Sequence, residues 1–255
     1  MMGKRIAIVN QKGGVGKSTT AINLGAALAE YDLQILVIDI DPQGNATSGL
    51  GLDKDEIELS IYDLLLENAS FYEVLQETGI PRLKIIPANI DLAGAEIELV
   101  SEISREKRLS RAIADYHQEF DYLLIDCPPS LGILTLNALT AAEEVLVPIQ
   151  CEYYALEGLG QLLDTIRRVR ENVNPELDLA GVLLTMYDGR TNLSEQVAEE
   201  VKKYFSEKIF ETIIPRNVRL SEAPSFGESI IQYQPRSSGA KAYKELAREV
   251  LANEQ

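Results

Sequence analysis

A glycine-rich segment near the N-terminus has the residue types of a phosphate-binding loop. Its residues are Lys12, Gly13, Gly14, Val15, Gly16, Lys17, Ser18 and Thr19. The apolar run 6–9 before it predicts a short buried strand, and Ser18 is expected to open a helix. This is the strand–loop–helix order that a P-loop requires. Glycines let backbone N–H groups turn inward around phosphate oxygens, and the start of the helix adds aligned donors and positive potential.

Two side chains of this loop predict a nucleotide with a divalent cation. Lys17 is placed to supply positive charge to the β- and γ-phosphates, and the Ser18 hydroxyl to ligate Mg²⁺. The alternative is a glycine-rich turn with a purely structural role, which does not explain Gly-Lys-Ser-Thr at the start of a helix. The sequence therefore predicts that the chain binds ATP with magnesium.

Carboxylates stand at the ends of two further apolar runs. Asp39 ends the run 34–39, Asp41 follows it two residues later, and Asp126 ends the run 122–126. Because the carboxyl ends of parallel strands face the ligand crevice, we expect these side chains near the phosphates. Asp126 has a Walker B position, where it would hold Mg²⁺, through water. Asp39 is a second candidate metal ligand, and its alternative role is that of a cap or ion-pair partner.

The elements that must position these residues alternate along the chain. Predicted strands cover 5–10, 34–39, 83–87, 122–126, 144–149, 180–185 and 209–214. Predicted helices cover 19–30, 93–103, 107–117, 131–142, 156–172, 192–205 and 240–252. Several runs are apolar on both faces, as expected of parallel strands covered by helices on both sides. The pattern predicts an α/β fold with a doubly wound, mostly parallel sheet, the P-loop NTPase fold, in one domain spanning 1–255.

The charge is strongly acidic but unevenly distributed. The net charge of −16 argues at first against nucleic acid as a partner. Residues 1–150 hold 11 Lys+Arg against 23 Asp+Glu, whereas residues 151–255 hold 13 against 17. The C-terminal half therefore leaves room for a local basic patch, and the overall charge does not decide the question.

Cysteine, histidine and hydropathy exclude other classes. Cys127 and Cys151 are too few and too far apart for a zinc cage, so we expect two buried apolar residues. His117 is the only histidine, and a surface position on its helix is expected for it. No uncharged apolar stretch approaches the ~18–20 residues of a membrane helix, and no signal peptide is present, so a cytoplasmic protein is expected.

The loop departs from the ordinary pattern G-x-x-x-x-G-K-[ST] at two positions. Gln11 replaces the first glycine, and Lys12 precedes the glycine pair. In this respect the sequence resembles the deviant Walker A ATPases, whose loop reads K-G-G-x-G-K-[ST]. The resemblance implies that Lys12 reaches across a dimer to the partner's nucleotide, so that two ATPs lie between two subunits. It also implies that Lys12, Lys17 and Asp41 act in catalysis, with Asp41 orienting or activating the attacking water. Residues 44–49 then act as switch I.

The resemblance extends over nearly the whole chain. The matching segments are 10–19, 41–51, 92–96, 126–132, 152–158 and 214–225. They are similar to the ParA/Soj chromosome-partitioning ATPases. The resemblance implies that Pro215 and Asn217 contact the adenine, and ATP is also favoured over GTP because Met186 stands where a guanine-reading motif has lysine.

Family membership implies an ATP-driven switch with weak intrinsic hydrolysis. ATP closes a homodimer, the dimer binds double-stranded DNA without sequence preference, and a ParB-like centromere-binding protein triggers hydrolysis and release. The protein would be nucleoid-associated when ATP-bound, and the replication initiator is a further candidate partner. Arg190 and Arg219 match the arginines that carry DNA binding in the family, and their alternative role is that of solvated surface residues.

Two other functions remain open at this point. A MinD-like ATPase would bind membrane through a basic amphipathic tail, which residues 239–255 do not supply. A non-catalytic regulator would use ATP binding only as a signal, and Asp41 argues against it.

Overall fold

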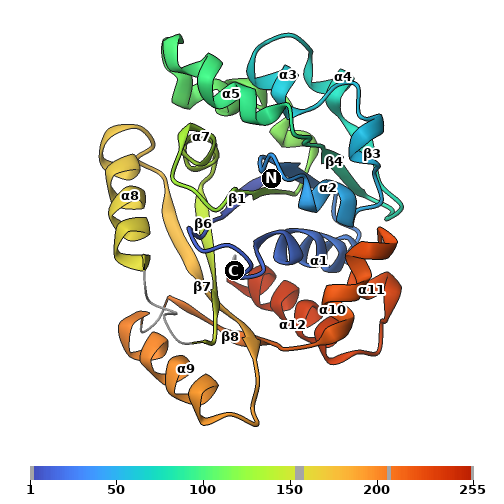
Figure 1. Ribbon diagram of the computed structural model, residues 1–255, viewed down its shortest axis with the longest axis vertical. Helices are drawn as coiled ribbons and strands as arrows, with labels where there is room; N and C mark the ends of the chain where they lie inside the picture. Colours follow the sequence, from blue (N-terminus) through green and yellow to red (C-terminus); the bar gives the residue numbers. More distant parts are fainter. Residues whose placement is uncertain (1–2, 153–157, 206–207, 254–255) are drawn as a thin grey trace.

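The computed structural model describes residues 3–152, 158–205 and 208–253. They form a sheet of eight strands in the order β3-β4-β2-β5-β1-β6-β7-β8 (Figure 1). The strands are β1 (Lys4–Ile8), β2 (Ile35–Asp39), β3 (Gln76–Glu77), β4 (Leu83–Ile86), β5 (Tyr122–Asp126), β6 (Glu144–Gln150), β7 (Asp178–Tyr187) and β8 (Ile209–Pro215). Neighbouring strands pair in parallel except β3 and β4, which are antiparallel. The mostly parallel α/β sheet predicted from the sequence is confirmed.

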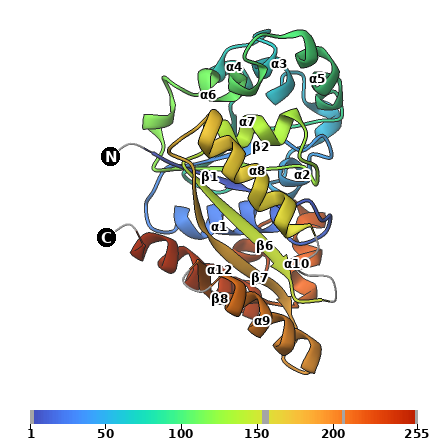
Figure 2. The ribbon, with the colours of Figure 1, turned by 90° about the vertical axis from the view of Figure 1, so that its left-hand side faces the viewer.

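Helices flank this sheet on both faces. They are α1 (Lys17–Ala29), α2 (Asn45–Gly49), α3 (Ile61–Leu65), α4 (Phe71–Val74), α5 (Leu92–Glu98), α6 (Arg108–Ala112), α7 (Ile133–Ala141), α8 (Leu159–Asn172), α9 (Asn192–Phe205), α10 (Val218–Glu222), α11 (Ile230–Tyr233) and α12 (Ser238–Ala252). Short 3-10 turns are η1 (Lys54–Glu56), η2 (Leu99–Ser101), η3 (Arg105–Lys107), η4 (His117–Glu119) and η5 (Ala223–Phe226). Figure 2 shows α12 alongside α1, with which it packs.

Two hydrophobic cores lie on the two faces of the sheet. Alternate residues of β1 illustrate the division, because Ala7 belongs to the core under α3–α9 whereas Ile6 and Ile8 belong to the core under α1, α2, α11 and α12. Strands buried on both sides explain why their sequences are continuous apolar runs.

The strand order places a topological switch beside β1. The strands that follow β1 in the sequence build one half of the sheet through β5, and later strands build the other half from β6 onward. Ligands of open α/β sheets bind at the carboxyl ends of the strands at such a point. The glycine-rich loop follows β1 and therefore lies at this position.

Several element boundaries differ from the prediction. The predicted helix 93–103 ends at Glu98 and continues only as η2, and Ser104 then takes a left-handed φ of 53°. The predicted helix 107–117 ends at Ala112. The predicted start of α8 at residue 156 lies outside the described residues. The strand β3 was not predicted, because an edge strand of two polar residues has no hydrophobic pattern.

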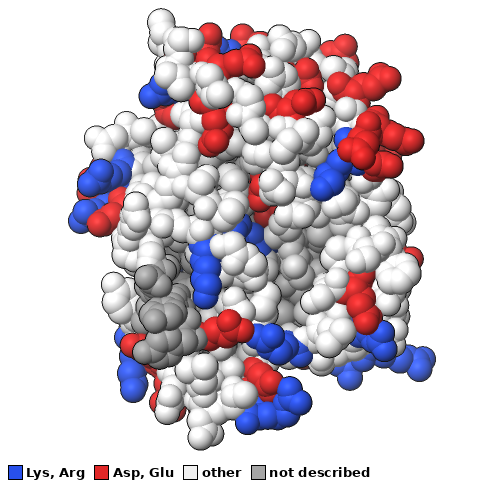
Figure 3. Space-filling model, in the orientation of Figure 1, with Lys and Arg blue, Asp and Glu red and all other residues white. Residues whose placement is uncertain are grey.

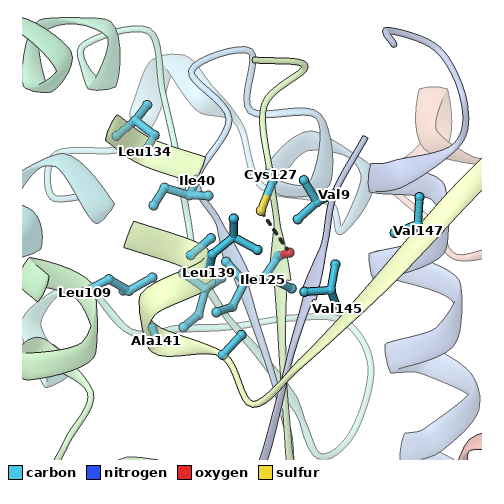
Figure 4. Close-up of a cluster of buried hydrophobic side chains, with 14 of the residues drawn as sticks. Val9, Ile40, Leu109, Ile125, Cys127, Leu134, Leu139, Ala141, Val145 and Val147 are labelled. Carbon is cyan, nitrogen blue, oxygen red and sulfur yellow. Dashed lines mark hydrogen bonds between the residues drawn. The ribbon is translucent and has the colours of Figure 1, made fainter. Parts of the chain in front are cut away.

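His117 is buried, so the predicted surface position is wrong. It lies in η4, and a Cβ on Gly3 would lie 2.4 Å from its carbonyl oxygen, because the chain passes closely over η4 as it enters β1. Cys127 and Cys151 are buried as predicted. Figure 4 shows Cys127 among aliphatic side chains, where burial raises the pKa of its thiol. No helix in the described part of the chain is long and apolar enough to span a membrane.

The edge strand β8 is hydrogen-bonded to α12 at two backbone positions. The Glu249 carboxylate accepts hydrogen bonds from the backbone N–H groups of Glu211 and Thr212, at 2.6 and 3.0 Å. The C-terminal helix therefore occupies backbone donors of the edge strand.

Candidate nucleotide site

The loop after β1 has the conformation of an anion cradle. Gly14 and Gly16 take left-handed φ values of 72° and 96°, and Gly16 caps α1. A Cβ at Gly13 or Gly14 would meet nothing within 4 Å, so these glycines border open space. A side chain at either position would fill that space, and at Gly14 it would also strain the left-handed backbone.

Hydrogen bonds to the distant strands β6 and β7 hold the loop in place. The Thr185 hydroxyl on β7 donates to the Val15 carbonyl at 2.8 Å in a buried contact. The Asn10 amide donates to the Pro148 carbonyl of β6 at 2.7 Å, and its oxygen accepts from the Lys12 N–H at 2.9 Å. Neither Asn10 nor Thr185 was predicted from the sequence to have a role at this site.

The two lysines of the loop differ in their surroundings. Lys17 is buried and its ammonium donates to the Lys12 carbonyl at 3.3 Å. Burial lowers the pKa of Lys17, and nearby Asp126 and Asp41 oppose this effect. The Lys12 side chain is half-buried and has no hydrogen-bond or ion-pair partner among the residues that the structure describes.

Asp126 is a buried carboxylate whose two oxygens lack well-formed hydrogen bonds within the described chain. Burial and the nearby Asp39 raise its pKa, whereas the Ser18 hydroxyl and Lys17 lower it. An unsatisfied buried carboxylate is costly unless it is protonated, paired or bound to a cation. With Ser18 beside it, Asp126 fits a magnesium ion held between the loop and β5.

Asp39 and Asp41 have different environments although they are two residues apart. Asp39 is fully buried, and its oxygens accept from Thr47 N–H at 2.9 Å, Thr47 hydroxyl at 2.8 Å and Asp41 N–H at 3.1 Å. These donors favour the alternative role of Asp39, as an anchor of α2, over that of a metal ligand. Asp41 accepts from Gln43 N–H at 2.9 Å and borders the cavity described next.

A cavity of about 640 Å³ brings the predicted residues together. The predicted residues that line it are Gly13, Gly14, Gly16, Lys17, Ser18, Thr19, Asp41, Pro215 and Asn217. Val15 is buried beneath the loop, and Lys12 is not among the lining residues. The side chain of Asn217 also caps α10 by accepting from Arg219 N–H, and donates to the Ser238 hydroxyl, each at 2.9 Å.

The two predicted DNA-contacting arginines are exposed and paired with carboxylates. Arg190 follows β7 and forms a two-pronged ion pair with Asp188, which lowers the pKa of Asp188 to about 2. Arg219 lies on α10 and pairs with Glu222 at 2.6 Å. Figure 3 shows Lys and Arg gathered over the lower part of the face, with acidic groups beside them and prevailing above.

Comparison with known sequences gives matches over the length of the chain. The family described as "AAA domain" matches residues 3–179. The sporulation initiation inhibitor protein Soj of Bacillus subtilis is 61% identical, over 99% of this chain and 100% of that protein. The chromosome partitioning protein ParA of Myxococcus xanthus is 54% identical, over 98% of this chain and 88% of that protein.

Solved structures share the fold of this chain over almost its whole length. Structures described as cobyrinic acid a,c-diamide synthase from Mycobacterium smegmatis, one with ADP and magnesium and one with an ATP analogue and magnesium, have TM-scores of 0.88 at 42% identity. The matches cover 99% and 98% of this chain, and 95% of the solved chain in both cases. A complex of a Cyanothece McdA variant with ATP shares the fold, with a TM-score of 0.88 at 21% identity over 98% of this chain and 97% of that one. With relatives of such identity along almost its whole length, this chain belongs to the ParA/Soj family of chromosome-partitioning ATPases.

Proposed function

We propose that this protein is a partitioning ATPase that binds ATP with magnesium, forms an ATP-sandwich homodimer and binds DNA without sequence preference. The observation that carries the proposal is the single cavity lined by the glycine loop, by Asp41, and by Pro215 and Asn217. The partitioning relatives and the M. smegmatis structures with ADP or an ATP analogue and magnesium support it.

Nucleotide binding would use the loop as it stands. The backbone N–H groups of the loop and the start of α1 would surround the phosphates, and Lys17 would balance their charge. Ser18 and Asp126 would hold magnesium, which supplies charge neutralisation between the β- and γ-phosphates. Pro215 and Asn217, which also line the cavity, would border the adenine.

Hydrolysis would depend on Asp41. One of its oxygens accepts from Gln43 N–H, which fixes the orientation of the carboxylate at the cavity wall. A carboxylate held in this way can accept a hydrogen bond from water and orient it toward the γ-phosphate. We expect weak intrinsic turnover that a ParB-like centromere-binding partner stimulates.

Dimerisation would depend on Lys12. Its side chain has no ion-pair partner in the described chain, whereas Lys17 in the same loop is buried and hydrogen-bonded. An unpartnered cation beside a phosphate site can complete the charge balance of a nucleotide held by a second subunit. ATP would favour the dimer only to the extent that it binds the dimer more tightly.

DNA binding would be the output of the dimer. Arg190 and Arg219 would contact phosphates, and two copies of each would raise affinity steeply and make it salt-dependent. The ATP-bound protein would then be associated with the nucleoid in the cytoplasm. Contact with the replication initiator is a further part of this proposal.

The decisive experiment measures dimerisation and DNA binding with ATP, with ADP and without nucleotide. Sedimentation at micromolar concentration and a mobility shift on two unrelated duplexes should both respond to ATP alone. A second candidate function, a membrane-bound ATPase, would instead give ATP-dependent co-sedimentation with anionic vesicles. Dimers or DNA complexes independent of nucleotide would contradict the switch.

A further inference from the structure

Two glycines from distant parts of the chain touch through their backbones. Gly51 follows α2, and Gly227 ends η5, with left-handed φ values of 89° and 66°. A Cβ built on Gly227 would lie 2.7 Å from the Gly51 Cα, and one on Gly51 would lie 3.1 Å from the Gly227 carbonyl oxygen. Real Cβ atoms do not approach backbone as closely as 2.7 Å, so Gly227 must lack a side chain for this contact to form.

On one side, the contact continues into the part of the site that borders Asp41. Gly44 N–H donates to the Asp41 carbonyl at 2.8 Å, and Gly44 caps the start of α2. Thr47 fastens α2 to Asp39 and accepts from Ala88 N–H at 2.9 Å. At the end of α2, Gly51 N–H donates to the Ser48 carbonyl at 3.0 Å. The helix α2 thus connects the loop that follows Asp41 directly to Gly51.

On the other side, the contact continues to Arg219. Phe226 precedes Gly227 and stacks on Tyr233, with ring centroids 5.0 Å apart. The Tyr233 hydroxyl donates to Glu222, and the same Glu222 oxygen pairs with Arg219. A shift of Gly227 would therefore displace Tyr233 and Glu222, which hold Arg219.

Both sides also border the nucleotide cavity. Asn45 and Ser48 of α2 line it, as do Ser221 of α10 and Pro224 of η5. A Cβ on Gly49 would lie 3.7 Å from the Pro224 ring, which is a second close approach between α2 and η5. The two segments thus form one packed unit around the nucleotide.

We propose that the Gly51–Gly227 contact is the joint through which the nucleotide state at the Asp41 loop sets the position of Arg219. Because the joint is backbone against backbone, it has no side chain that could rotate to absorb a displacement. Movement of α2 is passed directly to η5 and α10. The proposal rests on the proposed function for its DNA output, and it assigns Gly51 and Gly227 as positioning residues.

The first test is Gly227→Asn. Asparagine tolerates left-handed φ better than most residues, so the backbone conformation is kept while the new side chain forces the joint apart. The ratio of DNA affinities with ATP and with ADP should fall by about tenfold, the usual scale of allosteric coupling. By linkage, the stimulation of ATP binding by DNA should fall by the same factor.

The matched control is Gly79→Asn, because a Cβ there would meet only the Gln232 amide at 4.0 Å. This variant should keep the full ATP-to-ADP ratio. An unchanged ratio in a folded Gly227→Asn variant would overturn the joint.

A second measurement uses the unaltered protein and does not depend on a variant folding. Amide hydrogen exchange with ATP and with ADP should change together in residues 45–52 and 218–228. A change confined to one of these segments would overturn the joint. If the unaltered protein shows no ATP-dependent DNA binding, the proposed function fails, while the exchange data still decide whether the joint transmits.

Discussion

The glycine loop and the arginine segments are held by contacts of different kinds. The loop is pinned by hydrogen bonds with little access to water, such as that from Thr185 to Val15. Arg190 and Arg219 are held by exposed ion pairs with carboxylates of their own chain. A buried donor or acceptor that loses its partner pays its full desolvation cost, whereas an exposed ion pair exchanges readily with solvent or another anion. The molecule therefore combines a preorganised phosphate site with arginines that can be given up to phosphates of a partner.

The largest effect that tests this division is expected at Asp41. Asp41→Ala should lower ATP hydrolysis by about 10²-fold or more, the scale of a lost general base, because water loses its orienting carboxylate. ATP affinity, dimerisation and DNA retention should persist, since the loop and the arginines are untouched. Single-turnover assays measure the rate of hydrolysis, and filter binding measures the retention of ATP and DNA. Asp55→Ala, an exposed carboxylate of the following turn, is the control, and wild-type turnover in Asp41→Ala would refute the catalytic assignment.

The next largest effect is expected on stability, at Thr47, which fastens α2 to Asp39. Thr47→Val removes a hydroxyl that joins Asp39 to Ala88 N–H, which leaves the buried Ala88 N–H without this acceptor and Asp39 with one donor fewer. Such groups cost about 1–3 kcal/mol each, so the free energy of unfolding should drop by that order. Urea denaturation measures it. Ser48→Ala, in which a half-buried hydroxyl bonds only to Gly44, should lose less, and equal losses would argue against the buried network.

The hydrogen bond from Thr185 to the glycine loop gives a similar prediction. Thr185→Val keeps the shape of the side chain but leaves the buried Val15 carbonyl unpaired, at a cost of about 1–3 kcal/mol. ATP affinity should fall too, because the loop is no longer preorganised. Thr165→Val is the matched control, since that hydroxyl bonds to a carbonyl on the exposed face of α8. A folded Thr185→Val variant with unaltered stability and ATP affinity would show that the buried hydrogen bond does not preorganise the loop.

The smallest effect on the fold is expected at Arg219. Arg219→Ala should leave the melting temperature unchanged while weakening DNA binding and reducing the salt slope by about 1 per site. Arg167 is a close match, because it forms an exposed ion pair three residues along its helix, as Arg219 does. DNA titrations at several salt concentrations should separate the two. Equal loss of DNA binding in Arg167→Ala would point to general charge and not to a defined contact.

What the sequence predicts well is local. The glycine loop is contiguous, and the apolar strands that end in Asp39 and Asp126 are short and regular, so the sheet and the phosphate site could be predicted. Thr185 is 170 residues from Val15 in sequence, and one threonine in an apolar run gives no local signal of its role. The same limit applies to His117, whose burial depends on how the chain enters β1, and to Asp39, two of whose three donors come from a helix of five residues. These features depend on tertiary contacts that no spacing in the sequence encodes.

The two hydrogen bonds between Glu249 of α12 and the edge strand β8 have a consequence for assembly. Exposed strand edges recruit strands from other molecules, and the resulting sheets are slow to come apart. Because Glu249 occupies the N–H groups of Glu211 and Thr212, this margin is a poor template for such growth. Truncating α12 before Glu249 should therefore favour fibrous or amorphous aggregates over discrete oligomers. A chain that is proposed to pair and separate in every nucleotide cycle benefits from an edge that cannot join copies irreversibly.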